Sequence, residues 1–312
     1  MEQQAVLKEN NRSFLEADST VQLEQVKPAT WSDYLYLTKP GITISNLLTT
    51  FTGLWLASSG SLNLKVTVLT LIGTAFVIAS GAALNNYYDR ELDLKMKRTK
   101  NRAVATGRIH PRHAMGIGIA LLLAGLVVLG VCVNVLAAVI SLIGHIFYVL
   151  LYTPLKRVTT LNTVVGGVSG AVPPVIGWAA VTGSIDPTAL ILFTIIFLWQ
   201  FPHFLALAMM KVEDYRNGEV MMLPAVKGFA ETKRQIIRYT AALVPASILL
   251  FAFGTVGYVY LAAATLLGGI YLVMAFKGIF AKDDIVWAKK MFGYSLVYLL
   301  AMCAAILIST IS

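Results

Sequence analysis

A short polar segment, residues 84–102, carries acidic and basic side chains between two long apolar runs. Asn85, Asp89 and Asp93 are spaced by four residues, so on a helix that continues past Leu84 they lie on one face over about two turns. Amide and carboxylate oxygens are the ligands that Mg²⁺ takes in proteins, and Mg²⁺ keeps coordination positions for substrate phosphate. The spacing therefore indicates a magnesium site that acts on a phosphorylated substrate.

Four basic side chains follow this acidic ladder directly. Lys and Arg donate charge-assisted hydrogen bonds to phosphate oxygens, and Arg donates them in pairs, so metal and bases together would neutralise a diphosphate. The alternative is a solvated loop whose bases follow the positive-inside rule and whose acids pair with them. A polar ladder at the end of an apolar span is costly at the membrane interface, which favours a functional role. The bases are Lys97, Arg98, Lys100 and Arg102.

Membrane-spanning helices must position this segment. Of the 312 residues, 57% are hydrophobic and only 13% are charged, and the mean hydropathy is +0.72, values that exclude an ordinary soluble domain. Apolar runs of the length that crosses a bilayer as helix, about 17–25 residues, recur along the chain. They predict an all-α, polytopic bundle with about nine transmembrane helices. The runs are 42–58, 66–84, 114–132, 134–152, 162–182, 187–210, 236–257, 258–276 and 291–311.

Basic residues are distributed unequally between the two sides of such a bundle. The amino terminus and the loops after the even-numbered spans share one side, and they hold all of the 25 Lys and Arg residues except Lys65. Short loops rich in Lys and Arg stay in the cytoplasm. We therefore expect a multi-pass protein of the bacterial cytoplasmic (inner) membrane, with its N-terminus inside, its C-terminus outside and its polar site facing the cytoplasm. The net charge of +9 fits this bias and contact with the lipid bilayer better than nucleic-acid binding.

The domain organisation predicted from these patterns is simple. Residues 1–40 are expected to form a polar cytoplasmic tail, and residues 41–312 a single transmembrane domain. Cys132 and Cys303 lie within predicted spans without companions at ligand spacing, so neither a disulfide framework nor a zinc site is indicated. Pro173 and Pro174 are expected to kink or break the span that contains them.

Several segments resemble the UbiA-type intramembrane prenyltransferases. The later ones are similar to the branch of that family that uses haem as acceptor. Two places depart from the usual pattern: Ala103 stands where the family commonly has Pro, and "GEVMMLP" (218–224) replaces a more regular loop. The segments are the Asn85-x₃-Asp89-x₃-Asp93 ladder with "MKRTKNRAVATGRI", then "YTPLKRVTTLNTVVGGVSGAVPPVIGW" (152–178), "WQFPHFLALAMMKVEDY" (199–215) and "MMLPAVKG" (221–228).

The resemblance implies an enzyme that transfers the farnesyl group of farnesyl diphosphate to a vinyl group of protohaem IX (haem B), with addition of water, to give haem O and diphosphate. It implies Mg²⁺ as cofactor and a second acidic site at the end of the sixth span. The implied metal ligands are Asn85, Asp89 and Asp93; the catalytic set adds Arg98 and Arg102; the diphosphate-binding residues are Lys97, Arg98, Arg102, Lys156 and Arg157; and the second acidic site is Glu213 with Asp214.

A reaction through an allylic cation needs apolar walls that exclude water and aromatic faces that stabilise positive charge. Aromatic residues at suitable depths are Tyr87, Tyr88, Tyr148, Tyr152, Trp199 and Phe201, although for most of them, taken singly, packing at the membrane interface is the better explanation. His203, in "FPHF", is the histidine that we expect to ligate haem iron or to orient a propionate; the alternative is a hydrogen-bonded packing residue. His145 has no such support in the sequence.

Two other functions fit parts of the sequence. One is a UbiA-type enzyme that acts on a quinone precursor or chlorophyllide, and the other is a membrane transporter or haem-handling protein, because Gly-rich, broken spans also suit transport. Contact with haem A synthase or with oxidase assembly proteins is a further expectation.

Overall fold

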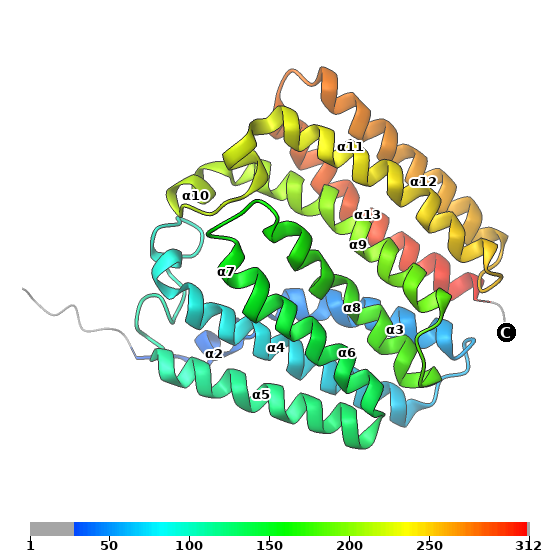
Figure 1. Ribbon diagram of the computed structural model, residues 1–312, viewed down its shortest axis with the longest axis horizontal. Coiled ribbons are helices and arrows are strands. Elements are labelled where there is room, and N and C mark those ends of the chain that lie inside the picture. Colours follow the sequence, from blue (N-terminus) through cyan, green and yellow to red (C-terminus); the bar gives the residue numbers. More distant parts are fainter. Residues whose placement is uncertain (1–27, 311–312) are drawn as a thin grey trace, which may run out of the picture.

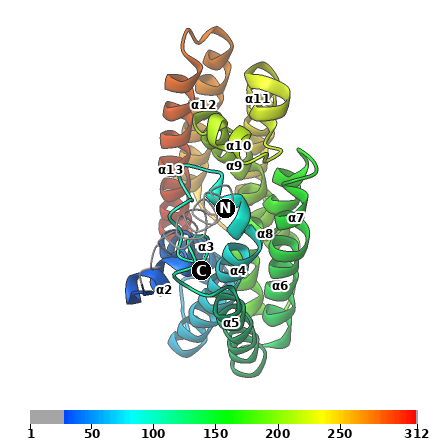
Figure 2. The same cartoon turned by 90° about the vertical axis from the view of Figure 1, so that its left-hand side faces the viewer.

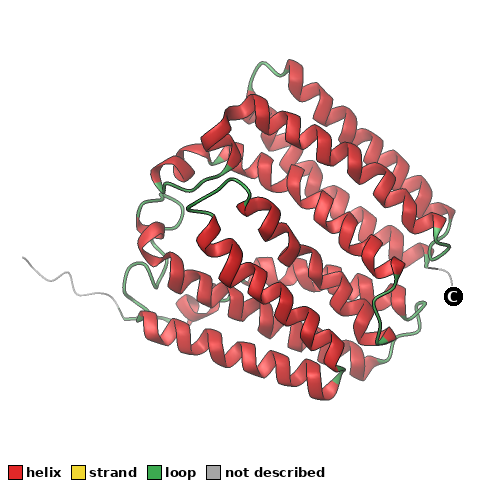
Figure 3. Cartoon of the chain, in the orientation of Figure 1, coloured by secondary structure: helices red, strands yellow, loops and turns green. Residues whose placement is uncertain are grey.

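A computed structural model describes residues 28–310 of the chain. Within these residues the protein is helical and contains no β-strand; a single isolated bridge pairs Val256 with Thr310 (Figure 3). Most of the expected polar tail, residues 1–27, lies outside the described residues.

Nine long helices form the body of the molecule. They are α3 (Pro40–Ala57), α4 (Leu64–Leu94), α5 (Pro111–Cys132), α6 (Val135–Ile146), α8 (Asn162–Thr182), α9 (Pro187–Met210), α11 (Leu223–Ala252), α12 (Tyr258–Lys277) and α13 (Asp284–Ser309), counted within residues 28–310. The short elements are α2 (Trp31–Leu37), the π-helical η1 (Phe147–Tyr152) that joins α6 to α7 (Thr153–Leu155), α10 (Val212–Asn217), and the 3₁₀ turn η2 (Gly278–Phe280).

Eight candidate spans in the described chain are long and apolar enough to cross a membrane, and α6, η1 and α7 together form one of them. The expected all-α, multi-pass membrane fold is therefore confirmed. The first expected span, α3, is not among the eight, because Asn46 and several threonines interrupt its apolar sequence. It nevertheless packs against α4 and α8 inside the bundle. The count of nine spans and the orientation of the termini stay predictions.

The helices pack in two groups along the chain. Helices α3 to α8 form one group and α9 to α13 the other, and the contacts of α8 with α9 and of α3 with α13 join them (Figure 1). The α2–α3 junction and the segments after α4, α7 and α9 gather at one end of the bundle, which faces the viewer in Figure 2. The charged segments predicted to share one side of the membrane therefore meet at one end of the molecule.

Helix α4 continues ten residues past Leu84, and this extension carries the acidic ladder. Asn63 caps its N-terminus by accepting from the Val66 amide, and the helix of 31 residues is about 46 Å long, against about 30 Å for a hydrocarbon core. The extra turns bury the ladder against neighbouring segments: Asn85, Asp89 and Asp93 are each at most 4% exposed.

The start of one expected span and the expected break in another were wrong. The segment assigned to α11 begins at Leu223 with Pro224 in its first turn, is kinked at Gly228 (φ 75°, ψ 177°), and is helical again well before residue 236. Helix α8 runs unbroken through Pro173 and Pro174. Prolines are tolerated in membrane helices where neighbouring helices support the freed backbone groups, and α8 has such neighbours in α3, α6 and α9.

The short helix α2 is fixed to the loop that follows α4. Thr30 and Asp33 form a capping box, and Arg108 donates to Asp33 Oδ1 from Nη2 at 2.9 Å and from Nε at 3.2 Å. The Arg108 hydrogen bond and the Thr30 amide lower the pKa of Asp33 from 3.8 to about 2. The contact therefore stabilises α2 fully above pH 3.8 and is lost as the pH falls through about 2.

The Arg108→Ala substitution should lower the free energy that holds α2 in place by about 1 kcal/mol. The effect is small because the Arg108–Asp33 pair is partly exposed and screened by solvent. Hydrogen–deuterium exchange at neutral pH should become faster in residues 31–38, and Arg112→Ala should leave it unchanged. Arg112 is an exposed base in the first turn of α5, and it forms no ion pair with other residues of the described chain. Equal exchange in wild type and Arg108→Ala would show that the pair does not hold α2.

Candidate active site

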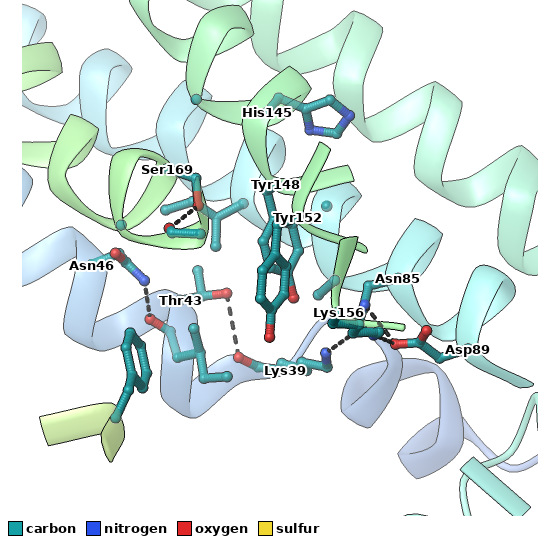
Figure 4. A pocket seen from close by; sticks show the side chains of 18 of the residues that line it. Lys39, Thr43, Asn46, Asn85, Asp89, His145, Tyr148, Tyr152, Lys156 and Ser169 are labelled. Carbon is teal, nitrogen blue, oxygen red and sulfur yellow. Dashed lines mark hydrogen bonds and ion pairs between the residues drawn. The ribbon is translucent and has the colours of Figure 1, made fainter. Parts of the chain in front are cut away.

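A cavity of about 390 Å³ lies among α3, α4, α6, α8 and α9, a size in the range of small-molecule sites, about 300–1,000 Å³. One end is polar and is formed by the acidic ladder and its bases, and the rest is bounded mainly by apolar and aromatic side chains (Figure 4). Its polar end is lined by Lys39, Asn85, Asp89, Asp93, Arg98, Arg102 and Lys156, and its other walls include Val77, Ile78, Tyr148, Tyr152, Val172, Ile176, Phe204 and Leu207.

Asn85 and Asp89 are hydrogen-bonded to each other, and all three ladder residues contact basic side chains. Asn85 Nδ2 donates to Asp89 Oδ2 at 2.7 Å, and the same carboxylate oxygen accepts from Lys156 Nζ. Lys39 Nζ donates to Asn85 Oδ1 at 2.7 Å. Arg102 Nη1 donates to both oxygens of Asp93, at 2.9 and 2.8 Å. Each ladder residue therefore has a different base as its partner.

The partner bases come from three separate segments. Lys39 lies at the α2–α3 junction in a left-handed conformation (φ 50°, ψ 62°), Lys156 follows α7, and Arg102 lies in the loop after α4. Burial, together with the positive charges of Arg102 and Lys156, lowers the pKa of Lys39 to about 7. Burial also lowers the pKa of Lys156, although its pairing with Asp89 opposes that effect. The concentration of positive charge suits the binding of an anion.

The ladder fits a magnesium ion that takes its remaining ligands from a phosphate. Asp89 Oδ1 is buried and has no hydrogen-bond partner among residues 28–310, so this oxygen remains available for a cation. Those residues contain no group of three or more His, Cys, Asp or Glu side chains that could hold a metal. A site with one amide and two carboxylate oxygens matches Mg²⁺, which commonly uses one or two carboxylates together with substrate phosphates.

The remaining predicted diphosphate ligands divide into two groups. Arg98 lines the cavity together with Arg102 and Lys156, whereas Lys97, Lys100 and Arg157 do not. Arg157 Nη2 lies 4.0 Å from Asp89 Oδ1 with its side chain 45% exposed. Lys97 and Lys100 are exposed. The structure thus brings three of the predicted bases into the cavity and adds Lys39.

The predicted second acidic site lies beside the cavity and not in its lining. Glu213 pairs with Arg216 at 2.8 Å on the exposed surface of α10, and Asp214 Oδ1 accepts from the Lys97 amide at 3.2 Å. Asp214 therefore ties α10 to the loop after α4, while the next residue, Tyr215, lines the cavity. A metal-binding role for the two acids stays a prediction.

Only some of the predicted aromatic residues line the cavity. Tyr148 and Tyr152 stack with ring centroids 5.6 Å apart and line the cavity (Figure 4). Trp199, Phe201 and His203 lie outside its lining. Tyr87 and Tyr88 lie outside the lining as well.

His203 occupies a packed site between α9 and α13. Its ring stacks on Trp199 at 4.9 Å and on Phe292 at 4.7 Å, and its Nδ1 lies 2.7 Å from Ser295 Oγ. Trp199 Nε1 donates to the Ser295 carbonyl at 2.8 Å. A role of His203 in haem binding remains a prediction, and these contacts describe a hydrogen-bonded residue on the face of α9 that packs against α13.

Two residues of the cavity were missed from the sequence. Lys39 is the only base between residues 27 and 65, directly before an apolar run, which is the signal that could have found it. His145 lies within an apolar run and lines the cavity from α6; no sequence pattern distinguishes it from a packing histidine.

Residues 46–297, most of the chain, match the model of the UbiA prenyltransferase family. The chain belongs to the UbiA prenyltransferase family. Among curated relatives of this UbiA prenyltransferase, the protoheme IX farnesyltransferase of Alkalihalophilus pseudofirmus is 47% identical over 92% of this chain and 93% of its own length. The Bacillus pumilus protein of the same name is 47% identical over 97% and 99%, respectively.

Solved structures show the same fold. A structure of digeranylgeranylglyceryl phosphate synthase has a TM-score of 0.75 at 20% identity and covers 88% of this UbiA prenyltransferase and 98% of its own chain. A UbiA homologue from Archaeoglobus fulgidus bound to GPP and Mg²⁺ has a TM-score of 0.63 at 18% identity, with coverage of 88% and 99%. The bundle is therefore the fold of UbiA homologues.

Proposed function

We propose that this UbiA prenyltransferase transfers the farnesyl group of farnesyl diphosphate to a vinyl group of haem B, with addition of water, giving haem O and diphosphate. The observation that carries the proposal is the buried Asn85–Asp89–Asp93 ladder, with its bases, at one end of an apolar cavity. The acceptor is supported by the relatives named protoheme IX farnesyltransferase, which match this chain over nearly its whole length at about 47% identity.

The reaction breaks the C1–O bond, the π bond of the vinyl group and one O–H bond of water, and it forms one C–C bond and one C–O bond with release of a proton. The C1–O bond of farnesyl diphosphate breaks, and diphosphate leaves with the electron pair. The outer carbon of a haem vinyl group bonds to C1, the inner carbon becomes cationic, and water adds to it and loses a proton. The barrier is set by negative charge that develops on the diphosphate, so groups that bind this charge accelerate the first step.

The polar end of the cavity would bind the diphosphate. Asn85, Asp89 and Asp93 would hold Mg²⁺, which when bound neutralises the developing charge of the leaving group. Arg102 contacts the Asp93 carboxylate and Lys156 contacts the Asp89 carboxylate, and both side chains are long enough to turn from carboxylate to phosphate oxygens. Arg98 also lines the cavity, forms no ion pair with a carboxylate among residues 28–310, and would add a third phosphate donor.

The apolar walls would hold the farnesyl chain and keep water away from the allylic cation. Tyr148 and Tyr152 present stacked rings within the cavity, where their faces stabilise positive charge near C1. Their position next to the ladder, one and two turns before Lys156, places aromatic faces beside the diphosphate end (Figure 4).

The distribution of basic residues supports a cytoplasmic site in the bacterial inner membrane. The end of the bundle that carries the ladder also carries the loops rich in Lys and Arg. Farnesyl diphosphate would enter from that side. Contact with haem A synthase or oxidase assembly proteins is part of the same proposal, because a membrane-embedded product is best handed on within the membrane.

Product analysis tests the proposal. Membranes that contain this chain, supplied with labelled farnesyl diphosphate, haem B and Mg²⁺, should form labelled haem O, identified by mass, and chelation of the metal should stop its formation. Prenylation of an aromatic acid without haem O would instead identify an enzyme of quinone synthesis. Substrate movement without product would identify a transporter.

The Lys39→Met substitution should lower kcat/KM for farnesyl diphosphate about 10- to 100-fold, because a hydrogen bond that involves a charged group contributes about 1.5–3 kcal/mol. Lys39 Nζ donates to Asn85 Oδ1 and adds positive charge at the polar end of the cavity, so the variant should bind diphosphate more weakly. The helices should remain folded. Lys65→Met, at the opposite end of α4, is the control and should retain kcat/KM. Unchanged kinetics in Lys39→Met would exclude a role in substrate binding.

A further inference from the structure

Three polar side chains that line the cavity beyond the acidic ladder each have one buried polar atom without a hydrogen-bond partner among residues 28–310. Thr74 Oγ1, Ser141 Oγ and His145 Nδ1 are buried atoms without a hydrogen-bond partner in the described part of the chain, and all three residues belong to the cavity lining. Their residues are 0%, 2% and 8% exposed, respectively. Buried polar atoms are normally satisfied, and when they face a polar, roomy cavity their partner is water or a polar ligand group.

The His145 ring lies close to Gly81 of α4. A Cβ added to Gly81 would lie 3.0 Å from Tyr148 Cδ1 and 3.7 Å from His145 Nδ1, so both rings approach the α4 backbone there. Gly81 precedes Asn85 by four residues, about 6 Å along the helix axis. His145 Nδ1 therefore lies about one helical turn deeper than the first ladder residue.

The other two groups extend this polar strip into the cavity. Ser141 precedes His145 by four residues and shares its face of α6, while Thr74 precedes Gly81 by seven residues, about 10 Å along α4. Figure 4 shows His145 on the opposite side of Tyr148 and Tyr152 from Lys39. Water on this strip is thus separated from the diphosphate end by the two tyrosine rings.

The proposed reaction needs one water molecule at a defined place. Water that reaches C1 of the allylic cation gives farnesol, whereas water that reaches the inner vinyl carbon completes haem O. A base that lies next to the inner vinyl carbon and is screened from C1 would direct water to the vinyl carbon. Among residues 28–310, His145 is the histidine that lines the cavity.

We propose that His145, with Ser141 and Thr74, binds the water that adds to the vinyl group and that His145 Nδ1 accepts its proton. The inference rests on the proposed function. The outer vinyl carbon bonds to C1 as diphosphate leaves with the C1–O electron pair, and the inner carbon takes the positive charge. The water oxygen then bonds to the inner carbon as one of its O–H bonds breaks, and that proton passes to Nδ1 and is returned to solvent after haem O leaves. With the ring proton on Nε2, Nδ1 is an acceptor.

The test combines rate, product identity and the source of oxygen. Purified wild type, supplied with farnesyl diphosphate, haem B and Mg²⁺ in ¹⁸O-water, should form haem O with labelled hydroxyl oxygen; failure here would overturn the proposed function itself. His145→Ala and His145→Gln should form haem O about 100-fold more slowly or worse, the effect of losing a general base. Their product should shift to farnesylated haem without the hydroxyl group, because the cation then loses a proton.

Matched variants separate this role from a structural one. Ser141→Ala removes one water partner and should reduce haem O formation about tenfold, consistent with the loss of about one hydrogen bond. Ser80→Ala removes a hydroxyl of α4 that is also buried and unpaired within residues 28–310 but does not line the cavity, and it should have no effect. The thermal unfolding midpoint and farnesyl diphosphate binding of both His145 variants should match wild type. Hydroxylated product at the wild-type rate, or loss of farnesyl diphosphate binding together with activity, would overturn the assignment of His145.

Discussion

The Asp89→Asn variant is expected to lose about 100-fold or more of its prenyl-transfer rate. An amide at this position cannot give negative charge to a metal ion, and metal stabilisation of a leaving group contributes several kcal/mol, with 1.36 kcal/mol for each factor of ten. Asp89 is 3% exposed and has one oxygen without a partner in the described chain. Single-turnover kinetics with farnesyl diphosphate and haem B, at saturating Mg²⁺, measure the loss.

The same substitution leaves a buried base without its anion. Lys156 is 7% exposed and donates to Asp89 Oδ2, and removing one partner of a buried ion pair costs about 3–5 kcal/mol. A double variant, Asp89→Asn with Lys156→Met, should recover most of the lost thermal stability in detergent and none of the activity. This separation shows whether inactivity follows from the missing metal ligand or from unfolding.

The control is Glu91→Gln, which changes an exposed acid on the same turn of α4. It should retain the activity and the unfolding midpoint of wild type. Wild-type turnover in a folded Asp89→Asn variant would refute the metal site. Recovery of activity in the double variant would show that Asp89 acts mainly by holding Lys156.

The second large effect is expected at the closest approach between α3 and α8. A Cβ on Gly177 would lie 2.0 Å from the Thr50 carbonyl oxygen and 2.8 Å from the Leu54 amide nitrogen. The approach is reciprocal, since a Cβ on Gly53 would lie 2.0 Å from the Pro174 carbonyl oxygen. Gly177→Ala should therefore destabilise the bundle by about 3 kcal/mol or more, the upper part of the range for overpacking, because backbone atoms cannot turn aside.

A thermal unfolding series in detergent measures this effect. Gly116→Ala in α5, where an added Cβ meets nothing within 4 Å, is the matched control and should leave the midpoint unchanged or raise it slightly, because Ala favours helix. Equal unfolding midpoints for the two variants would show that α3 and α8 can move apart without loss of stability.

Much of the fold could be predicted because membrane helices have a simple sequence signal. The apolar runs located the long helices, and the four-residue spacing of Asn85, Asp89 and Asp93 correctly required α4 to continue past Leu84. The start of α11 could not be found from hydropathy, because Lys227 and Lys233 interrupt the apolar pattern on either side of the kink at Gly228. The prolines of α8 were misread because their tolerance depends on neighbouring helices, which sequence does not display.

The site residues that lie close together in the sequence could be predicted. Those that only the tertiary structure brings together could not. The ladder and Arg102 lie within one stretch of sequence, so spacing and charge were sufficient to group them. Lys39 reaches Asn85 across 46 residues, and its left-handed backbone gives no pattern in the sequence. His145 and His203 look alike as single histidines in apolar runs; only packing shows that one lines the cavity and the other stacks against α13.

The basic side chains that contact the ladder outnumber its carboxylates. Lys39, Arg102, Lys156 and Arg157 contact a ladder that contains only two carboxylates, so positive charge is in excess at this end of the cavity. A bare divalent cation meets repulsion there, whereas a cation already neutralised by diphosphate meets attraction. If the ladder holds Mg²⁺ as proposed, electroneutrality favours entry of metal and diphosphate as one ion pair. It would equally favour their joint departure, so that release of the product anion is coupled to release of its metal.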